Sequence, residues 1–193
     1  PTTSASHFHL LRRQAYSRPR KPLIVFTPKQ LLRLKAAASS VEDFTTGSFR
    51  TVIPEHEQLQ ADAVERVLLV SGRLYYDLLS TRQKTGDKTT AIVRVEQLYP
   101  LPAAEIAAEL AKYPNADVVW AQDEPANQGP WPFIGLNLPD ALDRRVRLVS
   151  RPASASTAGR ITSRTRSASS RTWAVDGSRL AAGAIGSCTI SVT

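Results

Sequence analysis

The stretch VLLVSGRLYYDLL at residues 67–79 decides the expected fold. Residues 67–70 form a continuous apolar run, which is typical of a strand buried on both faces of a sheet. Ser71 and Gly72 follow as a turn, and the pattern of residues 74–79 predicts a helix. A buried strand that leads directly into a helix is the unit from which parallel sheets are built. The stretch therefore predicts an α/β domain.

The same alternation recurs along the chain. Apolar runs predict further strands at 23–26, 91–95, 117–121 and 146–149, and the segments after them predict helices at 29–37, 103–112 and 133–142. Thr27 is a suitable N-cap for the helix at 29–37, with Pro28 in its first turn. Together these elements predict an open, mostly parallel sheet of about five strands flanked by helices, with right-handed crossovers. The connection at 38–65 is long, and a loop of this length in a compact domain often has a functional role.

The net charge of +8 resides in the two ends of the chain. Residues 1–22 hold five basic residues and no acidic one, and residues 151–193 hold six Arg and one Asp. The body at 23–150 holds 14 basic and 16 acidic residues, and its cations are not interleaved with aromatic residues as in single-strand binders. We therefore expect no nucleic-acid partner. A single Cys, three scattered His and the lack of a long apolar run indicate a cytoplasmic, metal-free domain without a membrane span.

Two strand-to-helix turns have the composition of an anion site. In open α/β sheets, ligands bind outside the carboxyl ends of the strands, where helix N-termini favour negative charge. The turns are Thr27-Pro28-Lys29 and Ser71-Gly72-Arg73, and Arg50 in the long connection offers a bidentate phosphate contact. The alternative is ordinary capping of two helices beside a surface Arg. Asp123 and Glu124 are adjacent on an extended segment, so we expect them to point in opposite directions and to serve in a turn or an interface.

Six ordered strings carry a resemblance to a known family. They are FHLLRRQ at 8–14, RKPLIVFTPK at 20–29, SGRLYYDL at 71–78, IVRVEQLYP at 92–100, QDEPANQG at 122–129 and RPASAS at 151–156. Through them the chain resembles the C-terminal part of the thiamine-dependent, decarboxylating component of 2-oxoglutarate dehydrogenase. VEDF at 41–44 is similar in particular to the actinobacterial type, the multifunctional 2-oxoglutarate metabolism enzyme.

The resemblance implies that this chain is a piece of a larger enzyme. Residues 1–20 are then a remnant of a preceding pyrimidine-binding domain, and residues 21–156 are a transketolase-type C-terminal domain. The implied parent oxidatively decarboxylates 2-oxoglutarate in the tricarboxylic acid cycle and passes succinyl to lipoamide, with thiamine diphosphate and Mg²⁺ bound upstream. The resemblance further implies that the parent is a homodimer and has dihydrolipoyl succinyltransferase as a partner. It also implies that the isolated chain has no turnover. The alternatives are a stand-alone module that binds an acetyl-CoA-type nucleotide and a domain with an interaction role only.

The resemblance also implies roles for single residues. His9 matches the family histidine that contacts the substrate carboxylate. From its apolar neighbours alone, His9 is interpreted as a packed or hydrogen-bonded structural residue, although His can bind a carboxylate or shuttle a proton. The residues that match positions suited to holding the activator acetyl-CoA are Thr27, Arg50, Ser71, Arg73 and Arg151.

Two departures from the family pattern bear on these expectations. Arg73 stands where the family usually has Lys, and the two side chains contact phosphates differently. Residues 157–193 are rich in Ser, Thr, Arg, Ala and Gly and lack the family's closing helix. We interpret this low-complexity tail as disordered and as the product of a shifted reading frame or an erroneous gene end.

Overall fold

A five-stranded sheet with the order β1-β3-β2-β4-β5 organises residues 1–155, which are the residues that the computed structural model describes. Its strands are β1 (Val52–Ile53), β2 (Arg66–Val70), β3 (Thr90–Val95), β4 (Asp117–Pro125) and β5 (Val146–Arg151). β2 pairs in parallel with β3 and β4, β4 pairs in parallel with β5, and β1 is antiparallel to β3. The predicted α/β class with a mostly parallel sheet of about five strands is confirmed.

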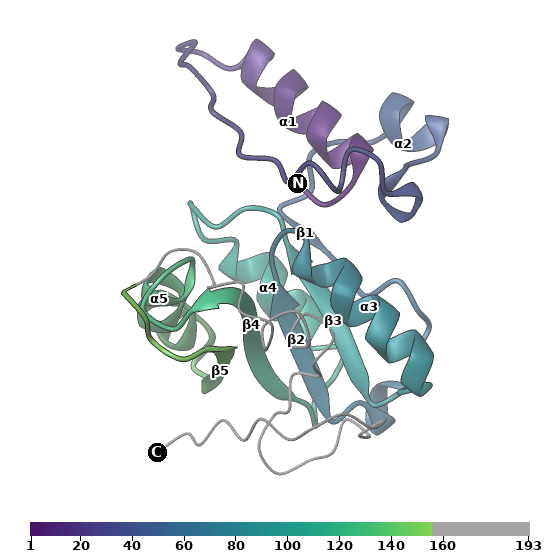
Figure 1. Ribbon diagram of the computed structural model, residues 1–193, viewed down its shortest axis with the longest axis vertical. Coiled ribbons are helices and arrows are strands. Elements are labelled where there is room, and N and C mark those ends of the chain that lie inside the picture. The colour runs from purple at the N-terminus through teal and green to yellow at the C-terminus, as the bar shows by residue number, and fades with distance from the viewer. Residues whose placement is uncertain (156–193) are drawn as a thin grey trace.

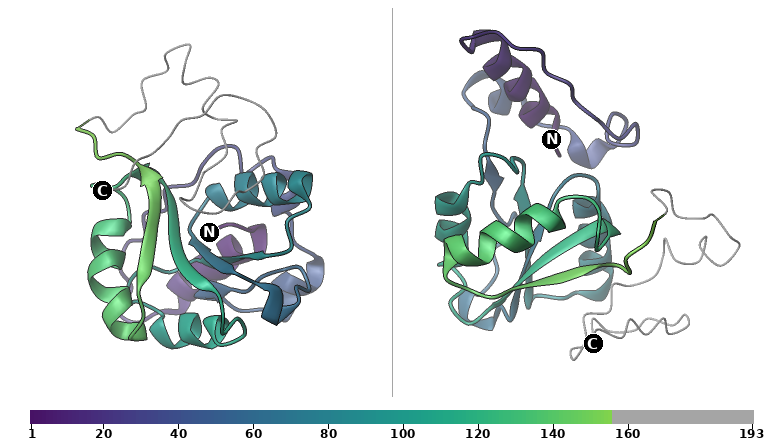
Figure 2. Two further views of the ribbon diagram at one scale, coloured as in Figure 1. Left: turned by 90° about the horizontal axis from the view of Figure 1, so that it is seen from below. Right: turned by 90° about the vertical axis from the view of Figure 1, so that its left-hand side faces the viewer.

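Helices cover both faces of this sheet (Figures 1 and 2). α3 (Leu74–Thr85) packs on one face, and α4 (Ala103–Leu110) and α5 (Trp131–Leu142) pack on the other. Because both faces are covered, every residue of β2 and β3 is buried. Trp120 of β4 has no exposed surface and belongs to the core on the side of α4 and α5.

The adjacent strands β2 and β4 send their connections to opposite faces. β2 leads through α3 to β3 on one side, whereas β4 leads through α5 to β5 on the other. The carboxyl ends of β2 and β4 therefore form a topological switch point, where open α/β sheets have a crevice suited to a ligand. α3 begins directly after the turn at Gly72, whose φ of +70° is a left-handed conformation that glycine adopts without strain.

The residues before β1 form short elements beyond the carboxyl ends of the strands (Figure 1). They are α1 (Ser4–Tyr16), the 3₁₀ turn η1 (Lys35–Ala37) and α2 (Val41–Thr45), and a second 3₁₀ turn, η2 (Ala61–Ala63), precedes β2. The hydroxyl of Thr3 caps α1 by accepting from the N–H of Ser6, and Ser40 and Asp43 form a capping box at the start of α2. In residues 1–155, no helix combines the length and the apolar character that a membrane span requires.

The expected first strand and helix are wrong. Residues 23–26 are not a strand, and Ile24 and Phe26 are 78% and 92% exposed. Residues 29–37 form turns and η1 in place of a helix, so Thr27 caps no helix. An apolar run becomes a strand only when a neighbouring strand satisfies its main-chain groups, and no strand in residues 1–155 pairs with this one. The fifth strand is instead β1, inside the connection at 38–65. The tail predicted at 157–193 lies outside the described residues.

Candidate ligand-binding site at the strand tips

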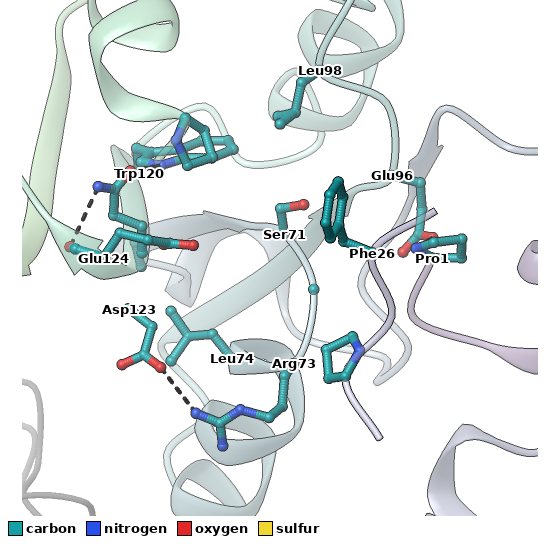
Figure 3. Close-up of a pocket in the computed structure, with 15 residues that line it drawn as sticks. Pro1, Phe26, Ser71, Arg73, Leu74, Glu96, Leu98, Trp120, Asp123 and Glu124 are labelled. Carbon is teal, nitrogen blue, oxygen red and sulfur yellow. Dashed lines mark hydrogen bonds and ion pairs between the residues drawn. The ribbon is translucent and has the colours of Figure 1, made fainter. Parts of the chain in front are cut away.

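A cavity of about 510 Å³ lies at the switch point (Figure 3). Its walls come from the β2–α3 turn at 71–73, the carboxyl end of β4 at 120–124, and Glu96 and Leu98 after β3. Phe26 and Pro28 approach it from the extended segment that follows α1. A Cβ built on Gly72 would meet no atom within 4 Å, so a ligand can approach the main chain there.

Arg73 lies at the edge of the cavity, immediately before α3 (Figure 3). Its Nη1 is 2.7 Å from Oδ2 of Asp77, one helical turn further on, and its Nη2 is 2.9 Å from Oδ2 of Asp123 on β4. Arg151, the last residue of β5, donates from Nε to the main-chain oxygen of Asp123 at 2.7 Å. Asp123 therefore contacts two arginines from different elements, of which Arg73 lines the cavity.

The charged side chains of the lining are net negative. They are the carboxylates of Glu96, Asp123 and Glu124 and the guanidinium of Arg73. Positive potential at the strand tips stays a prediction, which rests on Arg73 and the start of α3. Asp123 and Glu124 both line the cavity, but Asp123 pairs with Arg73 whereas the Glu124 side chain packs against Gly129, so the two side chains have different neighbours.

The buried amide of Gln122 shapes the β4 wall. Its Oε1 accepts from Nε1 of Trp120 at 3.1 Å and from the main-chain N–H of Trp131 at 2.9 Å. Its Nε2 donates to the main-chain oxygens of Pro125 at 3.0 Å and Gln128 at 2.8 Å. One side chain thus satisfies buried groups on both sides of the turn before α5, and the turn is fixed against the strand.

Glu96 fixes the start of α1 beside the cavity. Its fully buried carboxylate accepts from the N–H of Thr2 at 2.9 Å, from the Thr2 hydroxyl at 2.5 Å and from the Ser6 hydroxyl at 2.8 Å. Arg94, which stacks on Tyr75, donates to the same Thr2 hydroxyl at 3.2 Å. The Thr2 hydroxyl thus bridges a buried guanidinium and a buried carboxylate, which offsets the cost of burying either charge.

The family model described as 2-oxoglutarate dehydrogenase C-terminal matches residues 38–172, a range that includes all five strands and most of the cavity lining. The chain belongs to this family. The similarity of the chain to individual 2-oxoglutarate dehydrogenase components extends to residues outside that range.

Three relatives show the extent of the likeness. The 2-oxoglutarate dehydrogenase E1 component of Cupriavidus necator is 51% identical over 161 residues, 82% of this chain and 17% of that protein. The E1/E2 component of Corynebacterium glutamicum is 51% identical over 162 residues, 82% of this chain and 13% of that protein. The multifunctional 2-oxoglutarate metabolism enzyme of Mycobacterium sp. (strain JLS) is 50% identical over 147 residues, 74% of this chain and 12% of that protein. This chain therefore corresponds to less than a fifth of each relative's length.

The structure brings together part of the residue set that the family resemblance suggested. Ser71 and Arg73 line the cavity, and Arg151 reaches it through Asp123. Thr27 itself is not in the lining, although its neighbours Phe26 and Pro28 are. Arg50 is exposed before β1 and is not in the lining either. Sequence reasoning missed Glu96 and Gln122 as single residues. The signal was available, because both are polar residues at the carboxyl end of an apolar strand.

His9 lies in α1, away from the lining of the cavity. It is 3% exposed, its Nε2 donates to the main-chain oxygen of Asp43 at 2.7 Å, and its Nδ1 is buried without a partner in the described part of the chain. Gly47 packs so closely that an added Cβ would lie 2.8 Å from Nε2 of His9. This is the environment of a packed, hydrogen-bonded histidine in contact with α2. Residues 1–155 hold no group of three or more His, Cys, Asp or Glu arranged to bind a metal ion.

Proposed function

We propose that this chain works as the C-terminal domain of a 2-oxoglutarate dehydrogenase E1 component. The supporting observation is 51% identity over 82% of the chain to E1 and E1/E2 components, together with a complete sheet in the matched region. The division into residues 1–20, 21–156 and 157–193 belongs to this proposal. So do the parent's oxidative decarboxylation of 2-oxoglutarate, succinyl transfer to lipoamide and cytoplasmic location.

The proposal assigns the cofactor chemistry to the upstream part of the parent. Thiamine diphosphate, held by Mg²⁺, would accept electrons as CO₂ leaves 2-oxoglutarate. In this proposal the groups that hold thiamine diphosphate and Mg²⁺ belong to the upstream part of the parent. His9 would contact the substrate carboxylate only in the assembled parent. The purified chain is therefore expected to bind no thiamine diphosphate and to show no turnover with 2-oxoglutarate, which a coupled decarboxylation assay would test.

The second part of the proposal is that the strand-tip cavity binds a polyphosphate group, with acetyl-CoA as the activating ligand. The cavity lies at the switch point of the sheet, Gly72 leaves the main chain open, and Arg73 lines it beside Asp123, whose main-chain oxygen contacts Arg151. Activation would follow if acetyl-CoA binds one state of the parent more tightly than another.

Calorimetric titration of the purified chain with acetyl-CoA tests this site. Arg73→Ala removes a guanidinium from the lining and is expected to weaken binding by about tenfold or more, because a charge-assisted hydrogen bond contributes roughly 1.5–3 kcal/mol. Arg147→Ala is the matched control, since Arg147 lies at the opposite end of β5 and pairs with Asp117 at 3.8 Å. Equal binding by wild type and both variants would exclude Arg73 from the site. Absence of heat at millimolar acetyl-CoA would count against the site as a whole.

An interaction role has separate support in the segment between α1 and η1. Ile24 and Leu32 are 78% and 71% exposed, which is unusual for apolar residues so near each other in the sequence. We expect this segment to contact a second copy, in keeping with a homodimeric parent that also binds dihydrolipoyl succinyltransferase. Light scattering of the chain should then show dimers that dissociate when Ile24 and Leu32 are both changed to Ser. A strictly monomeric wild type would argue against this contact.

A further inference from the structure

Asp123 lines the strand-tip cavity and contacts two arginines, of which Arg73 lines the cavity as well. Its Oδ2 lies 2.9 Å from Nη2 of Arg73, and its main-chain oxygen accepts from Nε of Arg151 at 2.7 Å. Asp77 contacts the other terminal nitrogen of Arg73 at 2.7 Å. Both terminal nitrogens of the Arg73 guanidinium are thus engaged by carboxylates of the chain itself.

These contacts put a carboxylate where an anionic ligand would bind. A guanidinium recognises phosphate through paired N–H groups, and one of these on Arg73 now faces Asp123. Asp123 lines the cavity, whereas Asp77 does not. A phosphate that enters the cavity therefore meets Arg73 only after the Asp123 side chain turns away, and it is repelled until then.

We propose that Asp123 is an internal competitor for Arg73 that sets how tightly this cavity holds a phosphate group. The inference rests on the assignment of the cavity to a polyphosphate and adds the device that sets its affinity. The Asp123–Arg73 ion pair is partly exposed, with side-chain exposures of 54% and 36%, so a ligand can displace it at low cost. A ligand that brings more negative charge to Arg73 gains more from replacing Asp123 there, so pyrophosphate should bind more tightly than orthophosphate.

Asp123→Asn isolates this competition. The amide keeps the size of the side chain and leaves the main-chain oxygen that holds Arg151, but it removes the charge that faces Arg73. Calorimetry with inorganic pyrophosphate should show binding about three- to tenfold tighter than in wild type, from the loss of an exposed ion pair and a like-charge repulsion.

Two controls carry the same change of charge. Asp117→Asn alters the amino end of the same strand, where Asp117 is 67% exposed, and is expected to leave the affinity within about twofold of wild type. Glu124→Gln removes a carboxylate from the lining without changing a partner of Arg73, so its gain should be smaller than that of Asp123→Asn.

A double-mutant cycle with Arg73→Ala decides the mechanism. If Asp123 competes for Arg73, the gain from Asp123→Asn disappears when Arg73 is Ala. An equal gain in both backgrounds would overturn the competition and leave only a general charge effect. If wild type binds pyrophosphate and Asp123→Asn binds no more tightly than Asp117→Asn, the inference fails while the polyphosphate site stands. If neither pyrophosphate nor acetyl-CoA binds any variant, both the site and its competitor are refuted.

Discussion

The buried ion pair between Arg82 of α3 and Glu55, in the connection after β1, yields the sharpest prediction about stability. Arg82 contacts both oxygens of Glu55, at 2.5 and 2.9 Å, and donates to the main-chain oxygen of Thr90 at 3.0 Å. The side chains of Arg82 and Glu55 are only 4% and 2% exposed. Glu55 also accepts from the main-chain N–H of Ile92 at 2.6 Å. The pair therefore joins a loop, a helix and the central part of β3.

Arg82→Met would leave the Glu55 carboxylate buried without its cation. Removing one partner of a buried pair costs about 3–5 kcal/mol, because the remaining charge is uncompensated. With a urea dependence of about 2 kcal/mol per molar, the unfolding midpoint should fall by roughly 1.5–2.5 M. Urea titration at pH 7, followed by tryptophan fluorescence, measures this shift. Lys88→Met is the matched control, since Lys88 is 72% exposed in its ion pair with Glu57 and should change stability by no more than about 1 kcal/mol.

The pH dependence of this loss has a definite sign. Burial alone would raise the pKa of Glu55, but the hydrogen bonds and charge of Arg82 and two main-chain N–H groups outweigh it and lower the pKa below its ordinary 4.5. In wild type this contribution is therefore present above about pH 4.5 and is lost as the pH falls through the lowered pKa. Without Arg82, burial should raise the pKa of Glu55, so the variant should gain stability as the pH falls from 7 toward 5. A loss for Arg82→Met no larger than that for Lys88→Met, or one that does not change with pH, would refute this reasoning.

Three further predictions concern residues around the cavity and α1. Gln122→Ala should lower the free energy of unfolding by about 2–3 kcal/mol, because it leaves several buried polar groups without their hydrogen-bond partners. The near-ultraviolet circular dichroism of the tryptophans should weaken as well. Thr2→Val should speed deuterium exchange of the α1 amides while β2 and β4 stay protected, because it removes the hydroxyl that bridges Arg94 and Glu96. Thr2→Ser keeps the hydroxyl and should not speed this exchange. Equal exchange in both variants would count against the bridge. Gly47→Ala should displace His9, since its Cβ would lie 2.4 Å from a main-chain oxygen and 2.8 Å from Nε2; an unchanged imidazole spectrum by NMR would contradict this packing.

The parts of the fold that sequence could predict are those that local pattern and tertiary context both favour. β2, β3, β4 and β5 each arise from an apolar run that finds neighbours on the sheet, and Ser71 and Arg73 follow β2 into the cavity. The run at 23–26 has the same composition, but it has no pairing partner in residues 1–155. Propensity describes what a segment can form, and tertiary contacts decide whether it does.

The missed elements have weak local signals. β1 is two residues long, and its position depends on main-chain hydrogen bonds to the end of β3. No apolar run in the sequence indicates this pairing. α1 was missed because its buried residues are Ala5, Ser6 and His9, a small and polar set that does not produce an apolar stripe.

The strand order has a consequence for synthesis on the ribosome. β2 is the first of the four parallel strands to be made, yet it lies in the middle, and both of its neighbours, β3 and β4, are made after it. The apolar side chains of β2 therefore lack one of their neighbouring strands until some fifty further residues have emerged and β4 is complete. A nascent chain that stalls within that interval exposes an apolar, partly covered strand to chaperones. The sheet is complete only after α5 and β5 have been synthesised.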